Sequence, residues 1–530
     1  MADQKDNHQE VRSYHAATSH GERGFAPGPG VLDWANQPDP FRRYAGAELL
    51  PLPLTPGPAE IDFSALDTVG GIEARPLGPE SLSLFLELSM GLTAWKSYQG
   101  NRWALRANAS SGNLHPTECT LAAPAIPGLS EQPGIYHYAP LDHGLERLAT
   151  PGGDGASMLA ILSSVHWRES WKYGERAYRY CQLDAGHALG SIAYAAALLG
   201  WRARLLPEPS DEELAGLAGL DQREFAPGES EVPDFAIKID TGAGTSAPAG
   251  PIIGDWQGTP NRLSRQHVRW RGIEAVDAAA AKPRTSAPSQ SPMPLVAGGR
   301  GNIGIAAVDI IRRRRSAVAM DGATSMGKDA FLSLLGRAMP QPGAVPWNAL
   351  PHAPSLSLAI FVHRVDGLPP GLYLLARNTS HAPRLRAACD AEFAWAAVAD
   401  GLPLYLLREG DMRDAARSIS CGQDIAADGA FAMGMIADFE AVLKADGPCA
   451  YRRLHWEAGL IGQMLYLEAE AAGLRATGIG CYFDGSMRDL LGLTSQDWQS
   501  LYHFTIGGAV EDERLETQGG YHHLGDVRRS

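Results

Sequence analysis

RAYRYCQLDAGHALGSIAYAAALLG at residues 176–200 and YRRLHWEAGLIGQMLYLEAEAAGL at residues 451–474 are two versions of one pattern. Each contains Tyr-Arg, then an acidic residue followed by Ala-Gly, then a run of small and apolar residues that ends near a glycine. The length and apolar spacing predict a long helix in both places, and Gly200 is typical of a helix end. The small residues on one side permit the close approach of another backbone.

The two copies keep a constant separation of 273 residues. Asp184-Ala185-Gly186 falls on Glu457-Ala458-Gly459, and Gly219 falls on Gly492, with no gap across about 43 residues. Self-similarity at a long fixed period indicates two copies of one structural unit. A chain with two such units can imitate a homodimer, so a site that needs two subunits could lie between its halves.

The composition is that of a globular protein with several domains. The chain has 530 residues, of which 45% are hydrophobic and 20% charged, and this length suggests roughly two to four domains. A net charge of −14 argues against a nucleic-acid or anionic-membrane partner, because phosphates are bound mainly by Lys and Arg. No apolar stretch is long enough for a membrane span, and the polar N-terminus lacks the apolar core of a signal peptide.

The six cysteines are scattered and form no CxxC pair. This spacing does not support a zinc or dithiol site and favours reduced thiols. We therefore expect a cytoplasmic protein without a bound metal.

Composition shifts divide the chain into four parts. Residues 1–74 are expected to be a tail and an extension, with residues 1–25 disordered because they are polar. Two domains are expected at 75–240 and 301–530, separated by a Pro/Ala/Ser-rich linker at 241–300. Inside that linker, DWQGTPNRLSRQHVRW (255–270) has two tryptophans and is expected to pack on a domain surface.

Predicted strands surround both long helices. They are TLAAPAI (120–126), GIYHYAP (134–140), SLSLAIFVHRV (355–365), GLYLLAR (371–377) and HFTIGGAV (503–510), and ESLSLFLELSMGLTAW (80–95) has helical spacing. The elements do not alternate as strict βαβ units. The expected fold class is therefore α+β, with a mainly antiparallel sheet flanked by helices in each half.

Arg314-Arg315-Ser316 closes a run of four arginines. Adjacent guanidiniums and a hydroxyl near a helix end suit a phosphate dianion, because arginine forms bidentate charge-assisted hydrogen bonds. The alternative is a solvated basic turn.

Residues 108–116, NASSGNLHP, form a polar loop ahead of a predicted strand. Such a loop can direct backbone N–H groups and side-chain amides at the polar edge of a heterocycle. An ordinary turn rich in Asn and Ser would have the same composition.

TGIGC at residues 477–481 directly follows the second long helix. Its two glycines let the backbone approach a flat ligand closely. The first copy has Leu205-Leu206-Pro207-Glu208 at the matching offset. Only the second copy can therefore offer this loop to a ligand.

These motifs, their order and the duplicated helix resemble the nitroreductase family of FMN flavoproteins. The chain more closely resembles the azoline dehydrogenases of the SagB type, in a tandem form that covers about 75–515. Arg314-Arg315-Ser316 resembles the family's phosphate motif, and residues 478–481 resemble its glycine loop. Residues 109–116 resemble its Pro-Ser-x-x-Asn-x-Gln-Pro-like loop, with alanine for the first proline and His115 for the glutamine.

The resemblance implies one FMN between two nitroreductase-like halves packed as a pseudo-dimer. In the family each flavin site is built from both subunits of a homodimer. Here the phosphate motif occurs only in the second half and the Ser/Asn loop only in the first, so one composite site should remain. The cofactor-binding residues that the resemblance implies are Ser110, Ser111, Asn113, His115, Arg314, Arg315, Ser316, Gly478, Gly480, Cys481 and Arg514.

Lys172-Tyr173 stands just before the first long helix. This chain resembles the SagB-type dehydrogenases, which carry a Lys-Tyr pair ahead of the corresponding helix. In those enzymes the pair is implicated in removing a proton from the substrate. The resemblance therefore marks Lys172 and Tyr173 as catalytic candidates, since a buried lysine can act as a base. An exposed lysine beside a packing tyrosine is the alternative.

Three functions are open at this point. An azoline-oxidising enzyme would pass a substrate proton to Lys172 or Tyr173 and a hydride to flavin, with oxygen as the final acceptor. An NAD(P)H-dependent reductase of nitroaromatics would not need Lys172. A flavin-binding partner protein would have no turnover. The Lys-Tyr pair favours the first, with a small-molecule or modified-peptide substrate.

Overall fold

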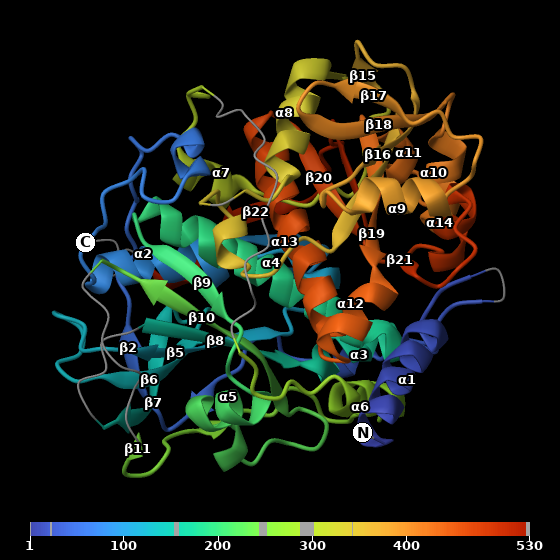
Figure 1. Ribbon diagram of the computed structural model, residues 1–530. Helices are drawn as coiled ribbons and strands as arrows, with labels where there is room; N and C mark the ends of the chain where they lie inside the picture. Colours follow the sequence, from blue (N-terminus) through green and yellow to red (C-terminus); the bar gives the residue numbers. More distant parts are fainter. Residues whose placement is uncertain are drawn as a thin grey trace.

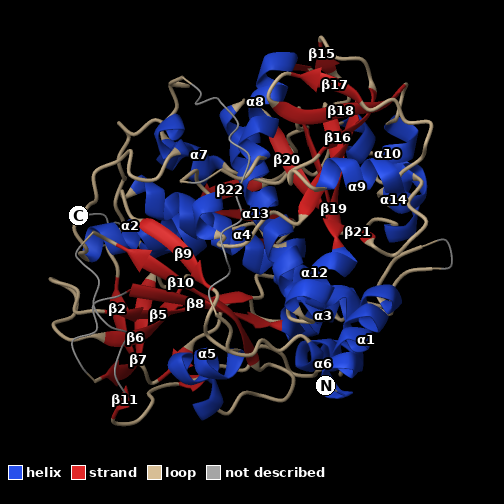
Figure 2. Cartoon of the chain, in the orientation of Figure 1, coloured by secondary structure: helices blue, strands red, loops and turns tan. Residues whose placement is uncertain are grey.

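The computed structural model describes residues 2–21, 24–152, 158–242, 252–286, 301–341 and 343–525. Two antiparallel sheets lie on either side of a central pair of long helices, with the first half in blue to green and the second in yellow to red (Figure 1). Further helices cover the outer faces of both sheets (Figure 2). The predicted mixed fold of helices and antiparallel sheets is confirmed.

The sheet of the first half has the strand order β11-β7-β6-β5-β8-β10-β9, with β2 paired to β7. Two of its strands come from outside the range 75–240 expected for this half. Its strands are β2 (Glu48–Pro51), β5 (Thr117–Ala123), β6 (Gly134–Ala139), β7 (Gly144–Pro151), β8 (Met158–Val165), β9 (Arg202–Leu206), β10 (Glu231–Asp240) and β11 (Ile252–Ile253).

The sheet of the second half has the order β17-β18-β16-β14-β19-β21-β20. Two of its central strands are wholly buried and largely apolar, which places them between layers of helices. The strands are β14 (Leu356–Val362), β16 (Gly371–Leu375), β17 (Ala396–Ala399), β18 (Leu402–Glu409), β19 (Phe431–Asp438), β20 (Arg475–Ile479) and β21 (Trp498–Gly507).

A small third sheet joins the C-terminal segment to the first half. The helix expected at 80–95 ends at Met90, because Gly91 closes it, and the chain continues as β3 (Leu92–Tyr98). This strand pairs with β4 (Asn101–Arg106) and with β22 (Glu516–Gly519) from the C-terminal segment. Tyr521 is buried there and accepts a hydrogen bond from the Leu92 amide at 2.9 Å.

Helices fill the space between and around the sheets. They are α1 (Ala2–Ala17), α2 (Pro79–Met90), α3 (His166–Tyr173), α4 (Ala177–Leu198), α5 (Asp211–Ala218), α6 (Arg271–Ala279), α7 (Ala307–Arg313), α8 (Lys328–Ala338), α9 (His381–Ala388), α10 (Arg413–Ile419), α11 (Ile425–Asp428), α12 (Phe439–Asp446), α13 (Ala450–Ala471) and α14 (Asp484–Leu491).

The 273-residue spacing recurs in the bounds of the elements. It carries α4 onto α13, β9 onto β20 and α5 onto α14, residue for residue. It also carries β8 and α3 onto β19 and α12. The strand order β6-β5-β8-β10-β9 of the first sheet corresponds to β16-β14-β19-β21-β20 of the second. The two halves therefore have matching elements in matching order.

The two long helices pack at their Ala-Gly pairs. Every residue of α4 is buried, including the polar side chains of Arg179, Asp184 and His187. A Cβ on Gly186 would lie 2.8 Å from the Trp456 Cα, and one on Gly459 would lie 2.8 Å from the His187 amide nitrogen. Backbone therefore packs against backbone, and one continuous hydrophobic core joins the halves.

Replacing Gly459 with alanine is expected to destabilise the protein by about 1–3 kcal/mol, because the added methyl overpacks a rigid helix crossing. The matched control is Gly336→Ala on α8, where a Cβ has open space and alanine should stabilise by about 0.5–1 kcal/mol. Thermal unfolding of both variants measures the contrast. Equal midpoints for the two would contradict the close packing described here.

A buried ion-pair cluster also connects the halves. Asp484 at the start of α14 accepts hydrogen bonds from Arg176 at 2.9 Å and from Arg179 at 2.7 Å. Burial alone would raise the pKa of this carboxyl, but the two guanidiniums outweigh burial and hold that pKa well below its usual range. Breaking such a buried pair is costly because it strands the remaining charge.

The prediction that residues 1–25 are disordered is wrong. Residues 2–17 form α1, and Val11, Tyr14, His15 and Thr18 are buried. These four follow the i, i+3, i+4, i+7 spacing of one helix face, a short stripe within an otherwise polar segment. The Arg179 guanidinium donates a 2.8 Å hydrogen bond to the His15 carbonyl, so the segment is fixed to α4.

The tryptophan-rich part of the expected linker packs on the protein, as predicted. Trp256 covers Gly219, and Leu263 and Ser264 are buried. The neighbouring Pro/Ser-rich stretches at 243–251 and 287–300 lie outside the described residues. Within the described part of the chain, no helix is both long and apolar enough to span a bilayer.

Candidate functional site

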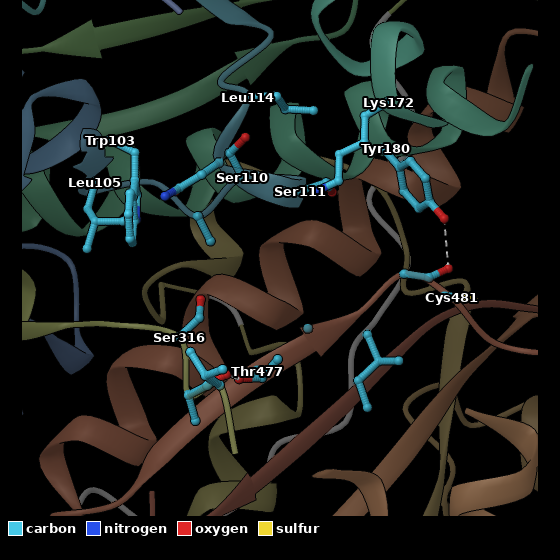
Figure 3. A pocket seen from close by; sticks show the side chains of 18 of the residues that line it. Trp103, Leu105, Ser110, Ser111, Leu114, Lys172, Tyr180, Ser316, Thr477 and Cys481 are labelled. Carbon is cyan, nitrogen blue, oxygen red and sulfur yellow. Dashed lines mark hydrogen bonds between the residues drawn. The ribbon is translucent and has the colours of Figure 1, made fainter. Parts of the chain in front are cut away.

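A cavity of about 1270 Å³ lies between the two halves. It exceeds the roughly 300–1,000 Å³ of most small-ligand sites, so it has room for a cofactor and a second ligand. Figure 3 shows Ser110, Ser111 and Lys172 on one side, facing Ser316, Thr477 and Cys481 on the other. Residues of both halves are therefore needed to enclose it.

The arginine motif forms one end of this cavity. Arg314 caps α7 and is buried, and its guanidinium donates to the carbonyls of Arg106 at 2.6 Å and Ala107 at 3.1 Å. Arg315 donates to the side-chain and backbone oxygens of Thr93. The motif of the second half is thus docked on the backbone of the first half.

The cavity end carries more positive charge than its neighbours neutralise. Burial, together with the nearby guanidiniums of Arg314 and Arg475, lowers the pKa of Arg315 to about 10. Arg475 is paired with Glu470, and its Nε lies 4.0 Å from a carboxylate oxygen of Glu511. Such mutual repulsion would be relieved by a bound anion. The donor set therefore fits a phosphate group.

The glycine loop lies beside the arginine motif. The Gly478 amide donates to the Tyr466 hydroxyl at 2.9 Å, and that hydroxyl lies 2.8 Å from the Ser316 Oγ. The Tyr180 hydroxyl of the first half donates to the Gly480 carbonyl at 3.0 Å. A Cβ on Gly480 would lie 2.7 Å from the Tyr180 ring. Glycine is therefore needed at both positions, because a larger side chain would collide with close neighbours and keep a ligand away from the backbone.

The Ser/Asn loop of the first half is held by both long helices. The Ser111 amide and hydroxyl donate to Asp184 of α4 at 3.1 Å. The Ala109 amide lies 3.3 Å from the Gln463 Oε1 of α13. His187 of α4 lines the same wall and lies 3.1 Å from the Tyr502 hydroxyl. The loop position therefore depends on the packing of α4 against α13.

Lys172 and Tyr173 converge on the tip of that loop. Gly112 has the left-handed φ of 59°, and a Cβ on it would lie 3.0 Å from the Lys172 Nζ and 2.5 Å from the Tyr173 hydroxyl. Burial, with added repulsion from Glu169, raises the pKa of Tyr173 well above its usual value. Tyr173 therefore keeps its proton at neutral pH and can donate a hydrogen bond into the cavity.

The acid of the repeated motif has different surroundings in the two halves. Glu457 accepts hydrogen bonds from the Ser355 amide at 2.8 Å and from the buried guanidinium of Arg377. Asp184, at the same position of the repeat, accepts from the uncharged Ser110 and Ser111. Burial therefore raises the pKa of Asp184 to about 7.

Asp184 should make the folded protein less stable as the pH rises. Its ordinary pKa is 3.8 and its folded value about 7, so the folded state binds the proton more tightly. The stabilisation is complete below about pH 4 and is lost as the pH rises through about 7. Denaturant unfolding across this pH range should show that the free energy of unfolding falls less steeply with pH for Asp184→Asn than for the wild type. Parallel pH profiles would contradict the assignment.

The structure gathers most of the predicted site residues around one cavity. Its lining includes Ser110, Ser111, Asn113, Lys172, Tyr173, Arg314, Arg315, Ser316, Gly478, Gly480 and Cys481. His115 is instead buried beneath the loop, 3.3 Å from the Ala104 carbonyl. Arg514 is exposed, pairs with Asp512 and lies outside the lining residues.

Several lining residues were not identified from the sequence. Tyr466 and Arg475 come from α13 and β20, and His20, Phe25 and Trp34 come from the segment expected to be a tail or extension. Aromatic residues in an otherwise polar N-terminal segment were the available signal for the latter group. Tyr466 and Arg475 could not be assigned, since their positions depend on the packing of the halves.

Residues 381–508 match the family model described as the nitroreductase family. A candidate nitroreductase from Anabaena variabilis is 23% identical, with a TM-score of 0.67 over 94% of this chain and 99% of its own. No curated protein matches the sequence.

Two further solved structures align over less than half of the chain. One is a candidate nitroreductase from Exiguobacterium sibiricum in complex with FMN, at 12% identity and a TM-score of 0.25, over 38% of this chain and 88% of its own. The other is the Escherichia coli microcin synthetase McbBCD complex with truncated pro-MccB17, at 18% identity and a TM-score of 0.25, over 44% and 93%. The Anabaena structure and the family match alone show that the chain has a nitroreductase-like fold and carries a segment, 381–508, that matches the nitroreductase family.

Proposed function

We propose that this protein is an FMN-dependent oxidoreductase of the SagB type, and that it oxidises a small-molecule or peptide-derived substrate. The observation that carries the proposal is the shared cavity, which joins a cationic end at Arg314, Arg315 and Arg475 to the Lys172–Tyr173 pair. The first group suits the flavin phosphate and the second suits removal of a substrate proton.

We propose further that the chain is a fused pseudo-dimer with one composite flavin site. Support comes from the matching elements of the two halves and from the backbone contact between α4 and α13. The halves contribute different parts: the second supplies the arginine motif and the glycine loop, the first the Ser/Asn loop and Lys172. In the second half, Glu457 stands at the position of Asp184 and is neutralised by Arg377.

The chain's own residues would bind and orient the reactants. Arg314, Arg315 and Ser316 would hold the phosphate, while the Ser110–Asn113 loop and the backbone at Gly478 and Gly480 would flank the flavin ring. Bound FMN would supply the acceptor for a hydride. Tyr173 would donate a hydrogen bond to the substrate. The Lys172 amine would accept the proton that the substrate loses.

The proposal is tested by anaerobic reduction of the FMN-loaded protein with a panel of probes. A synthetic peptide with a thiazoline or oxazoline ring should bleach the visible flavin absorbance, and the ring should be recovered as the aromatic azole by mass spectrometry. NADPH and NADH should reduce the flavin far more slowly. Rapid bleaching by NADPH, with no azole formed from the azoline peptides, would instead establish the reductase alternative.

A further inference from the structure

Two cysteines meet at the wall of the cavity. The sulfur atoms of Cys421 and Cys481 lie 2.7 Å apart, against about 2.05 Å for a disulfide bond. Both side chains are partly exposed, and Cys481 lines the cavity. They are 60 residues apart in sequence and belong to no CxxC pattern, so the fold alone brings them together.

The backbone on both sides of the pair is firmly anchored. The Gln423 side chain donates to the Cys481 carbonyl at 3.0 Å, and the Phe483 amide donates to the Ile419 carbonyl at 2.7 Å. Cys421 has a left-handed φ of 55°, which is uncommon for a residue other than glycine and is held here by these contacts. These contacts keep the two sulfur atoms within reach of each other.

The electrostatic environment separates Cys481 from the other thiols, because contact with Cys481 raises the pKa of its partner Cys421. Contact with Cys421, and then the nearby Arg176 guanidinium, lower the pKa of Cys481. Burial raises the pKa of Cys119, Cys181 and Cys389, and of the partly exposed Cys449. Reactive cysteines occur in partly exposed and electropositive surroundings, and of the six only Cys481 combines these features.

We propose that Cys421 and Cys481 are a redox-active dithiol that exchanges with small-molecule disulfides of the glutathione type entering through the cavity. The Cys481 thiolate attacks one sulfur of the disulfide, forms a mixed disulfide and releases one thiolate. Cys421 then loses its proton to solvent and attacks the Cys481 sulfur, which releases the second thiolate. Two electrons pass from the protein dithiol to the external disulfide, and the released thiolates take up the two protons.

The consequence is a link between thiol redox state and the cavity wall. The new bond would tie the glycine loop at 478–481 to the turn that follows α10, which also contributes Gln423 to the cavity. The pair lies within the second half, and the thiol exchange itself uses no flavin, although Cys481 lines the cavity that we assign to FMN. The proposal is therefore independent of the proposed function.

Oxidation of the full-length protein by glutathione disulfide tests the proposal, with and without FMN. Free thiols are alkylated, and the digested protein is analysed by mass spectrometry. We expect a Cys421–Cys481 cross-link in both preparations, reversed by dithiothreitol, with no retained glutathione. The Cys421→Ser variant should accumulate a glutathione adduct at Cys481, because the resolving thiol is absent. Cys449→Ser, the matched control, should behave as the wild type.

Two results would overturn the proposal. One is a wild-type protein in which both cysteines remain alkylatable at every ratio of glutathione to its disulfide. The other is a stable glutathione adduct at Cys481 of the wild type, which would show that Cys421 does not resolve it. If the cross-link forms in protein that fails to bind FMN, the result would support the redox-active dithiol. It would count against the proposed flavin site only.

Discussion

Replacing Arg314 with alanine is expected to raise the dissociation constant for FMN by about a hundredfold. The Arg314 guanidinium lines the cavity end that we assign to the phosphate. Loss of two charge-assisted hydrogen bonds, at about 1.5 kcal/mol each, amounts to about 3 kcal/mol. Titration of the apoprotein with FMN, followed by quenching of flavin fluorescence, gives the constant directly.

The chain provides a matched control for this experiment. Arg313 belongs to the same arginine run, is exposed and stands outside the lining residues, so Arg313→Ala should leave FMN affinity unchanged. Because Arg314 also donates to the carbonyls of Arg106 and Ala107, Arg315→Ala provides a second test at a less buried position of the motif. Wild-type affinity in both the Arg314 and the Arg315 variants would refute the phosphate assignment.

Replacing Lys172 with methionine is expected to slow flavin reduction by an azoline peptide by about 10²–10⁴-fold, the usual contribution of a general base. FMN occupancy should stay at the wild-type level, because Lys172 lies at the tip of the Ser/Asn loop rather than at the arginine end. Stopped-flow absorbance under anaerobic conditions measures the rate. Methionine preserves the length and apolar packing of the side chain.

The control for this variant comes from the matching helix of the second half. Lys444 lies in the last turn of α12, which corresponds to α3, and is exposed. Lys444→Met removes the same charge and should reduce the flavin at the wild-type rate. A Lys172→Met enzyme that reduces flavin as fast as the Lys444→Met control would remove the proposed base.

The sequence was sufficient for the elements whose signal is local. The long helices α4 and α13 follow from their small and apolar residues, and the constant 273-residue spacing anticipated their matching bounds. The N-terminal helix α1 was missed, because among its described residues the buried face is marked by Val11, Tyr14 and His15 within a polar segment. Its burial against α4 and α13 is a tertiary effect that propensity does not report.

The candidate site likewise combines residues with a local sequence signal and residues that only tertiary packing brings in. Arg314, Ser110 and Gly478 could be assigned from short motifs, and the structure places all three around one cavity. Arg475 and Tyr466 carry no motif, since they reach the cavity only through the packing of β20 and α13. Arg514 was assigned from the family resemblance, but its side chain pairs with Asp512 on the surface.

The ratio of FMN to protein chains is the most direct test of the central claim. If the halves form one composite site, purified protein reconstituted with excess FMN and freed of unbound flavin should retain one FMN per chain. The ratio should stay at one when the chain is monomeric by light scattering, since no second copy is needed. Two FMN per chain, or none, would contradict the single shared site.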